Sequence, residues 1–210
     1  MKEIKLPIMQ TVSLTISQQD IDPSKAIDIG GGRRGVSLGV MFDERIASLM
    51  ETARQNGGKI LYATTSIEQK IESILLEYFM GPFAGHDDKR VMFEHEVLQS
   101  TTLSFRAKKE LVTKIINNDS LLAGDKKSAA QRDLKKIMDW RNAFAHGKIQ
   151  HDTKRGCFIA YYSGEPKTET LDDHYWDEVE RVFRECDVLL DEAIRTLRSR
   201  KPMQYPGSAL

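Results

Sequence analysis

The stretch Asp139-Trp140-Arg141-Asn142-Ala143-Phe144-Ala145-His146-Gly147 decides the fold that this sequence predicts. It closes a segment whose apolar residues recur at steps of three and four, as on one face of an α-helix: Leu134, Ile137, Met138 and Ala145. Arg141 falls in the middle of this stripe. A guanidinium remains charged in proteins, and burying it without a partner is costly. We therefore expect Arg141 to meet a partner, to face an interface or to line a cleft.

His146 arrives where this helix should end, and Gly147 can provide the left-handed residue that closes many helices. Arginine clamps phosphate through a planar fork, whereas histidine gains and loses a proton near neutral pH. Because these two functions suffice for RNA cleavage, the pair Arg141 and His146 indicates a ribonuclease that needs no metal. Histidine would accept the proton of the 2′-hydroxyl or donate a proton to the leaving oxygen, and arginine would stabilise the negative charge that develops on the phosphoryl group. Because the 2′-hydroxyl is the nucleophile, DNA would not react.

The spacing of the two residues constrains this chemistry. On a continuous helix a residue five positions on lies about 140° around the axis, so Arg141 and His146 would point in different directions. Either the last turn unwinds before Gly147, or the two groups meet their counterparts from a second chain. The position of Arg141 on an apolar stripe favours the second alternative, because a dimer seam would give it a partner.

Composition sets the class of protein. With 210 residues, 40% hydrophobic and 30% charged, the chain predicts one globular domain, with or without an extension. No apolar run reaches the length of a membrane span, and Met1–Lys5 lacks the apolar core of a signal peptide. The two cysteines, Cys157 and Cys186, have no metal-type spacing and do not suggest a disulfide framework. We expect a cytoplasmic protein without a membrane partner.

Charge is balanced overall but unevenly distributed. Residues 104–155 hold thirteen Lys or Arg against six Asp or Glu, and residues 165–192 hold eleven acidic residues against three basic ones. These runs predict either two solvated faces or an anion-binding surface around the Arg141 segment.

The first part of the chain is predicted to be an N-terminal extension, residues 1–56, of unknown role. It carries an alternating stretch within residues 5–16 that favours a short strand, and a loop at Gly30–Gly35. A helix is expected over Phe42–Arg54, ending at Asn56-Gly57-Gly58.

A helical domain is predicted for residues 57–200, followed by a flexible tail at residues 201–210. Its first helix begins at Lys59 and stops near Gly81-Pro82, because proline cannot continue a helix. The polar segment 85–96 is expected to be a solvated loop. Although it contains His86 and His95, its spacing does not match a metal motif, so we expect no metal and no cofactor.

Three further segments complete this domain. Ser104 is expected to cap a second helix that ends at Asn117-Asn118-Asp119, and the third helix runs to Arg141. A loop over residues 147–156 leads into a β-hairpin, Cys157–Tyr162 with Lys167–Leu171. A strong apolar stripe from Trp176 to Leu197 predicts the closing helix. The fold class is therefore mainly α, an antiparallel helical bundle with a small β-hairpin before the last helix.

The sequence resembles the HEPN family, whose R-x4-6-H motif matches Arg141-Asn142-x-x-Ala145-His146-Gly147. Ser66-Ile67-Glu68, Ser104-Phe105-Arg106-Ala107-Lys108 and the helical order are also similar, over about residues 57–198. The resemblance implies a HEPN-like bundle, a homodimer that pairs two motifs in one cleft through the helix bearing Arg141, and metal-independent endoribonuclease activity. It also implies a toxin or phage-defence role, with a possible antitoxin or regulatory protein as partner.

Matched by position, the resemblance makes Arg141 and His146 catalytic and Asn142 a supporting residue. Glu68 and Lys108 are further supporting candidates, chosen because they are polar residues on the first two helices of the domain.

Two other functional readings remain open. His146 could cap its own helix while Arg141 pairs with Glu68, Glu72 or an acid of the last helix, as in a non-catalytic interaction or regulatory module. Alternatively, Arg141 could clamp the phosphate of a nucleotide, in a closed pocket that reaches the loop at Gly30–Gly35. An exposed Arg141 and His146 in a basic cleft would instead favour the ribonuclease.

Overall fold

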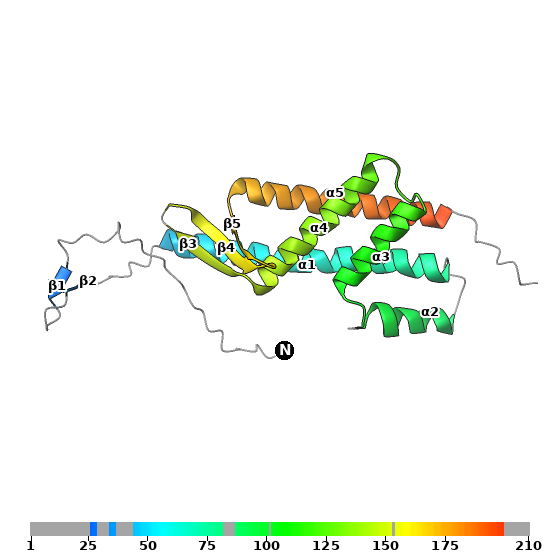
Figure 1. Ribbon diagram of the computed structural model, residues 1–210, viewed down its shortest axis with the longest axis horizontal. Coiled ribbons are helices and arrows are strands. Elements are labelled where there is room, and N and C mark those ends of the chain that lie inside the picture. Colours follow the sequence, from blue (N-terminus) through cyan, green and yellow to red (C-terminus); the bar gives the residue numbers. More distant parts are fainter. Residues whose placement is uncertain are drawn as a thin grey trace, which may run out of the picture. The chain divides into compact units, whose positions relative to one another are not determined.

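The computed structural model describes residues 26–28, 34–36, 44–81, 87–100, 102–152 and 154–199. It is mainly helical, with a small three-stranded antiparallel sheet before the last helix (Figure 1). The predicted mainly α class is confirmed. The chain divides into two units, Met1–Gly57 with His146–Asp173, and Gly58–Ala145 with His174–Leu210.

Helix α1 extends without interruption from Glu44 to Met80. The predicted break at Asn56-Gly57-Gly58 is therefore wrong. A glycine costs a helix about 1 kcal/mol relative to alanine, but Gly57 is buried and continues the stripe formed by Ala53 and Ile60. The apolar face on both sides of the glycine pair outweighs their low helix propensity. The helix ends where it was predicted to end, and Gly81 follows with a φ of +74°.

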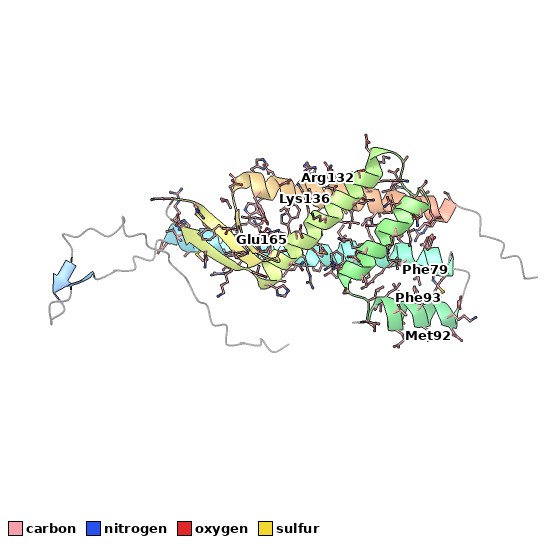
Figure 2. The ribbon with its side chains drawn as sticks, in the orientation of Figure 1. Phe79, Met92, Phe93, Arg132, Lys136 and Glu165 are labelled. Atoms are coloured by element: carbon pink, nitrogen blue, oxygen red, sulfur yellow. The ribbon has the colours of Figure 1, made fainter. Side chains whose placement is uncertain are left out.

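The polar segment after α1 is helical, which contradicts the loop predicted over residues 85–96. Asp87 caps α2 (Asp88–Met92) by accepting hydrogen bonds from the backbone nitrogens of Lys89 and Arg90. The chain continues as a π-helical segment, η3 (Phe93–Leu98). The ring of Phe93 lies 6.0 Å from that of Phe79 on α1, and both are labelled in Figure 2. The many charged residues of this segment favoured the prediction of a loop, although Phe93 packs against α1. His86 lies outside the described residues, among which no side chains cluster as metal ligands.

Helix α3 (Phe105–Asn118) has the start and the end that the sequence predicted. The hydroxyl of Ser104 accepts a hydrogen bond from the backbone nitrogen of Ala107 at 3.3 Å, which satisfies a donor that the helix leaves unpaired.

Replacing Ser104 with alanine is expected to lower the free energy of unfolding by about 1 kcal/mol, because the Ala107 amide loses its acceptor. Urea denaturation followed by circular dichroism measures this change. Ser104→Asp should retain most of the stability, since aspartate caps equally well. Equal losses in the two variants would contradict a capping role.

Helices α4 (Asp125–His146) and α5 (Asp173–Ser199) complete the helical unit. Lys126 binds Glu192 at 2.7 Å and Lys136 binds Glu178, so α4 runs antiparallel to α5 as predicted. Lys70 binds Asp187 and Asp191, whereas Glu77 binds Arg198 further along both helices. Helices α1 and α5 therefore run parallel, as Figure 1 also shows, because α4 carries the chain back before α5 begins.

The core of this unit is made of aliphatic side chains from all four long helices. Its fully buried members include Ile71, Ile74, Leu75, Val112, Ile116, Leu134, Ile137, Val182 and Leu190.

The sheet contains β3 (Lys148–Asp152), β4 (Gly156–Tyr162) and β5 (Pro166–Thr170), in that order and antiparallel. The predicted hairpin is confirmed as β4 and β5, with Gly164 at a φ of +76° in its turn. The loop predicted over residues 147–156 is wrong in part, because β3 pairs along β4 with Ile149 opposite Ile159. Strand β3 contains one apolar residue, Ile149, and four polar ones. Its sequence therefore lacks the alternation of apolar and polar residues by which a strand is predicted.

A second pair of strands lies near the N-terminus, with β1 (Ala26–Asp28) antiparallel to β2 (Arg34–Val36). The predicted loop at Gly30–Gly35 therefore gives way to strand at Arg34 and Gly35. The strand predicted within residues 5–16 and the tail at residues 201–210 lie outside the described residues. The boundary at residue 56 stays a prediction, although α1 crosses it.

No helix in the described parts of the chain is long and apolar enough to span a membrane. Both cysteines are free thiols. Cys186 lies on α5 with no exposed surface. Burial first, and then the charges of Asp133 and Asp187, raises the pKa of its thiol to about 12.

Cys186 is expected to resist DTNB at pH 8 in the folded protein. Its thiolate fraction there is about 1,000-fold smaller than that of an ordinary cysteine thiol, and only the thiolate reacts. A Cys157→Ala variant isolates the measurement, which follows absorbance with and without denaturant. Fast labelling of the folded variant would contradict the buried position of Cys186.

Candidate functional site

The C-terminal half of α4 packs against α5 through aromatic rings. The ring of Trp140 lies 6.1 Å from Tyr175 and 6.3 Å from Phe183, and Phe144 lies 6.0 Å from Trp176. These contacts bury Trp140 and fix which side of α4 faces the core. The arginine of the motif follows directly on the next position, about 100° around the helix.

Arg141 is exposed rather than enclosed by the apolar stripe. Along the row of α4 that contains it, Leu134 is buried, Met138 is half-buried, and Arg141 and Ala145 are exposed. The apolar stripe is therefore not buried along its whole length, because Trp140 and Phe144 turn the buried side of the helix toward α5. One edge of the α4 stripe thus leaves the core at this end and carries Arg141 into solvent.

The buried charge on α4 is a carboxylate instead. Asp133 is completely buried, and burial raises its pKa even though Arg132 opposes this effect. The Nε of Arg132 lies 3.2 Å from one carboxylate oxygen, and the other oxygen has no hydrogen-bond partner among the described residues. The spacing of Asp133 from Ile137 and Trp140, by four and seven residues, placed it on the buried face and could have revealed it.

The guanidinium of Arg141 is held by its neighbour. It donates a hydrogen bond from a terminal nitrogen to Oδ1 of Asn142 at 3.2 Å. The alternative in which Arg141 pairs with Glu68 or Glu72 is wrong, because Lys108 binds both of these carboxylates. The structure therefore places the side chains of Arg141 and Asn142 in contact, with the guanidinium exposed to solvent, and the supporting role of Asn142 stays a prediction.

His146 is the last residue of α4 and is exposed. Because α4 remains helical to this point, the alternative in which its last turn unwinds before Gly147 is wrong. Gly147 is not the left-handed cap that was predicted, since the described glycines with positive φ are Gly81, Gly124, Gly156 and Gly164. The chain passes instead directly into β3 at Lys148. Within the described ranges, the imidazole of His146 makes no hydrogen bond to a helix carbonyl, as capping would require.

Glu68 and Lys108 lie together in an ion-pair cluster between α1 and α3. The ammonium of Lys108 is 2.6 Å from Glu68 and 2.5 Å from Glu72, and the Lys108 side chain is only 5% exposed. Burial opposes its charge, but hydrogen bonds to both carboxylates outweigh this and raise the pKa of Lys108. Glu72 was considered only as a partner of Arg141 and not as a supporting residue, although it lies one helical turn after Glu68. Whether this cluster also supports a reaction stays a prediction.

Some residues of the basic run, 104–155, form ion pairs with residues of the acidic run, 165–192. Lys126 and Lys136, from the basic run, bind Glu192 and Glu178, from the acidic run. Figure 2 labels Lys136 and Arg132 on the part of α4 that precedes the motif. Fewer unpaired cations therefore remain on α4 beside Arg141 than the charge count of the sequence implies.

Two open grooves are lined entirely by described residues. One lies along α5 at His174, Asp177, Glu178 and Arg181. The other lies between α1 and α5, next to Phe183. Neither includes Arg141 or His146.

Comparisons of the chain with protein-family models, with curated proteins and with solved structures found no match.

Proposed function

We propose that the chain is a metal-independent endoribonuclease of the HEPN type, with Arg141 and His146 as its catalytic residues. The observation that carries this function is the exposure of Arg141, which binds Asn142 and pairs with no carboxylate among the described residues. A guanidinium left in solvent in this way retains its donors for a phosphate. His146 is exposed at the end of the same helix and is a suitable proton carrier.

The reaction needs no group beyond these residues and the RNA. The 2′-oxygen attacks the adjacent phosphorus and gives up its proton, while the bond to the 5′-oxygen breaks and that oxygen gains a proton. His146 accepts the first proton and, as imidazolium, donates a proton to the 5′-oxygen. Arg141 stabilises the negative charge that builds on the phosphoryl oxygens. The products are a 2′,3′-cyclic phosphate and a 5′-hydroxyl.

The site is a joint one, formed by two copies of the chain. On the regular end of α4, Arg141 and His146 lie about 140° apart around the axis. Arg141 of one copy and His146 of a second copy can reach the same phosphate, whereas the two residues of one helix point in different directions. The exposed edge of α4 at Arg141 and Ala145 offers the surface for such a homodimer. Glu68 and Lys108 enter only as the ion pairs that fix α3 against α1.

A non-catalytic interaction or regulatory module is the second candidate. It is favoured by the ion pairs between α4 and α5, which remove Lys126 and Lys136 from the charge available to RNA phosphates. In this case Arg141 would contact an acidic protein partner.

Incubation with a mixed RNA pool in EDTA distinguishes the two candidates. The nuclease is expected to produce fragments with 2′,3′-cyclic phosphate ends, which block 3′-end ligation until acid has opened the ring and a phosphatase has then removed the resulting monophosphate. Intact RNA after prolonged incubation with folded protein would count against catalysis and favour the interaction module.

A further inference from the structure

A completely buried carboxylate lies in the middle of the contact between α4 and α5. We call this contact the α4–α5 seam, and it extends from the ion pair of Lys126 with Glu192 to the packing of Trp140 on Phe183. Asp133 lies seven residues from both Lys126 and Trp140, and its side chain has no exposed surface. An apolar side chain would fill this position without the cost of burying a polar group, so stability alone does not account for an aspartate here.

The carboxylate of Asp133 receives less hydrogen bonding than a buried anion requires. One oxygen accepts a hydrogen bond from Nε of the adjacent Arg132 at 3.2 Å, and the other is buried without a hydrogen-bond partner among the described residues. The backbone amides around it lie in the interior of a 22-residue helix and bond within that helix. The side chain of Arg132 is 57% exposed, so solvent weakens its attraction for the carboxylate. Because an ionised carboxylate needs several donors, this position favours the neutral acid.

The groups of α5 that face Asp133 do not supply the missing positive charge. Arg181 attracts the carboxylate, but its guanidinium lies 2.7 Å from Glu185, which repels the carboxylate. Glu178 lies 3.9 Å from the same guanidinium. The thiol of Cys186 is buried and neutral, since burial is the first cause that raises its pKa to about 12. The cation and the anions of α5 therefore largely cancel at Asp133.

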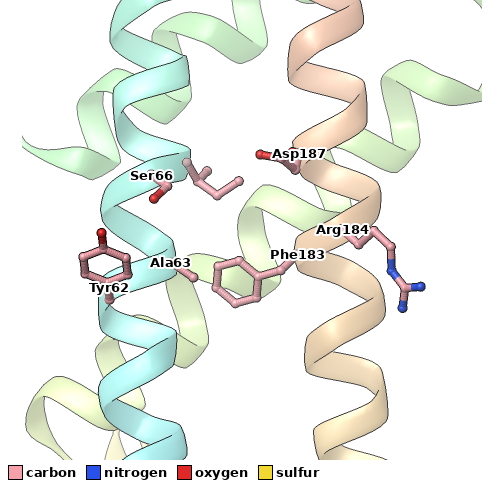
Figure 3. Close-up of a pocket in the computed structure, with 7 residues that line it drawn as sticks. Tyr62, Ala63, Ser66, Phe183, Arg184 and Asp187 are labelled. Carbon is pink, nitrogen blue, oxygen red and sulfur yellow. The ribbon is translucent and has the colours of Figure 1, made fainter.

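Helices α1 and α3 do not supply this charge either. Lys70 of α1 approaches α5, but its ammonium binds Asp187 at 2.6 Å. Asp187 points from α5 toward α1 (Figure 3). Helix α3 meets α4 near this position through Asn117, whose amide oxygen accepts a hydrogen bond from Gln131 at 2.7 Å. In the part of the chain that the structure describes, the buried carboxylate is thus left with an exposed arginine as its ion-pair partner.

We propose that the α4–α5 seam is strengthened by acid, because Asp133 holds a proton in the folded chain and the seam loosens when that proton passes to solvent. The neutral carboxyl group packs between the two helices without an uncompensated charge. The ionised group needs donors that water can supply only after the seam opens. This inference does not rest on the function proposed for Arg141 and His146.

The direction of the pH dependence follows from burial, which raises the pKa of Asp133 although Arg132 opposes this effect. A group whose pKa is higher in the folded chain contributes its full stability below its unfolded pKa, which is about 3.9 for aspartate. The contribution is lost as pH rises through the folded pKa. Glu178 in the same seam has the opposite sign, because its hydrogen bond with Lys136 lowers its pKa. The contribution of Asp133 must therefore be isolated by substitution.

Asp133→Asn tests the proposal in the full-length chain, because asparagine has nearly the same shape but does not ionise. Urea midpoints are measured between about pH 4.5 and pH 8 by the fluorescence of Trp140 and Trp176, the two tryptophans of the chain, which both pack in the seam. The wild-type midpoint should fall relative to that of the variant as pH rises, by roughly 0.5 M or more. Glu180→Gln removes an exposed carboxylate from α5 and should keep the wild-type pH profile. A difference between wild type and Asp133→Asn that stays constant, or that grows in favour of the wild type, would overturn the proposal.

Carbon-13 NMR of the wild-type protein decides the question if Asp133→Asn does not fold. The carboxyl carbon of Asp133, assigned through its own backbone, should titrate at a higher pH than an ordinary aspartate. The backbone amide signals of Glu185 and Cys186 on the facing side of the seam should shift with the same midpoint. A carboxyl group that titrates at or below about pH 3.9 would contradict the proposal. A titration at higher pH that leaves the amides of α5 unmoved would also contradict it, because the seam would then not respond to the proton.

Discussion

Replacing Arg141 or His146 with alanine is expected to lower RNA cleavage in EDTA at least 100-fold. Loss of one preorganised group that stabilises a developing charge costs about 100- to 1,000-fold in rate, and general acid–base catalysis contributes a similar factor. Both side chains are exposed, so neither truncation should disturb the core. Single-turnover cleavage of a labelled RNA measures the rate constant.

Two matched controls separate catalysis from general effects. Lys135→Ala removes another exposed cation from α4, and His174→Ala removes another exposed histidine from α5. Both should cleave within a few-fold of the wild-type rate. Equal cleavage by the Arg141, His146 and control variants would show that the motif does not carry the reaction.

Replacing Lys108 with methionine is expected to lower the free energy of unfolding by about 3–5 kcal/mol, as does removal of one partner from other buried ion pairs. The substitution leaves Glu68 and Glu72 facing one another without a cation. Urea denaturation measures the loss. Lys114→Ala, which removes an exposed lysine from the same helix, should change stability by less than about 0.5 kcal/mol.

A compensating variant tests the cause. Lys108→Met combined with Glu68→Gln and Glu72→Gln should regain part of the stability, because no buried charge then remains unpaired. The pH dependence has a definite sign. The pKa of Lys108 is raised in the folded chain, so its contribution is complete below the unfolded lysine pKa and is lost as pH rises through the folded one. A loss below about 1 kcal/mol in Lys108→Met would contradict the structural role of the cluster.

The elements that the sequence predicts well are those whose signals are local. Ser104 caps α3 through its own side chain, and the stripe of α5 repeats over about six turns, so both were predictable from the sequence. The continuous α1 was not predictable, because glycine propensity favours a break at Gly57 and only burial along the whole helix overrides it. Strand β3 depends on β4 for its pairing, which lies beyond any local pattern.

The candidate site shows the same division. Arg141, Asn142 and His146 could be selected from the sequence because the motif is contiguous on one helix. The exposure of Arg141 could not, since it depends on how Trp140 and Phe144 orient α4 toward α5. The pairing of Lys108 with Glu68 and Glu72 depends on the packing of α3 on α1. Asp133 was overlooked because a charged residue on a buried face contradicts the simple apolar pattern.

Mixing the two inactive variants tests most directly whether Arg141 and His146 act together from two copies. In a two-fold dimer of Arg141→Ala with His146→Ala, one of the two joint sites keeps both an intact arginine and an intact histidine. Half of the dimers in an equimolar mixture are of this kind, so cleavage in EDTA should return to about a quarter of the wild-type rate. A mixture as inactive as either variant alone, after subunit exchange has been verified, would contradict a site shared by two copies.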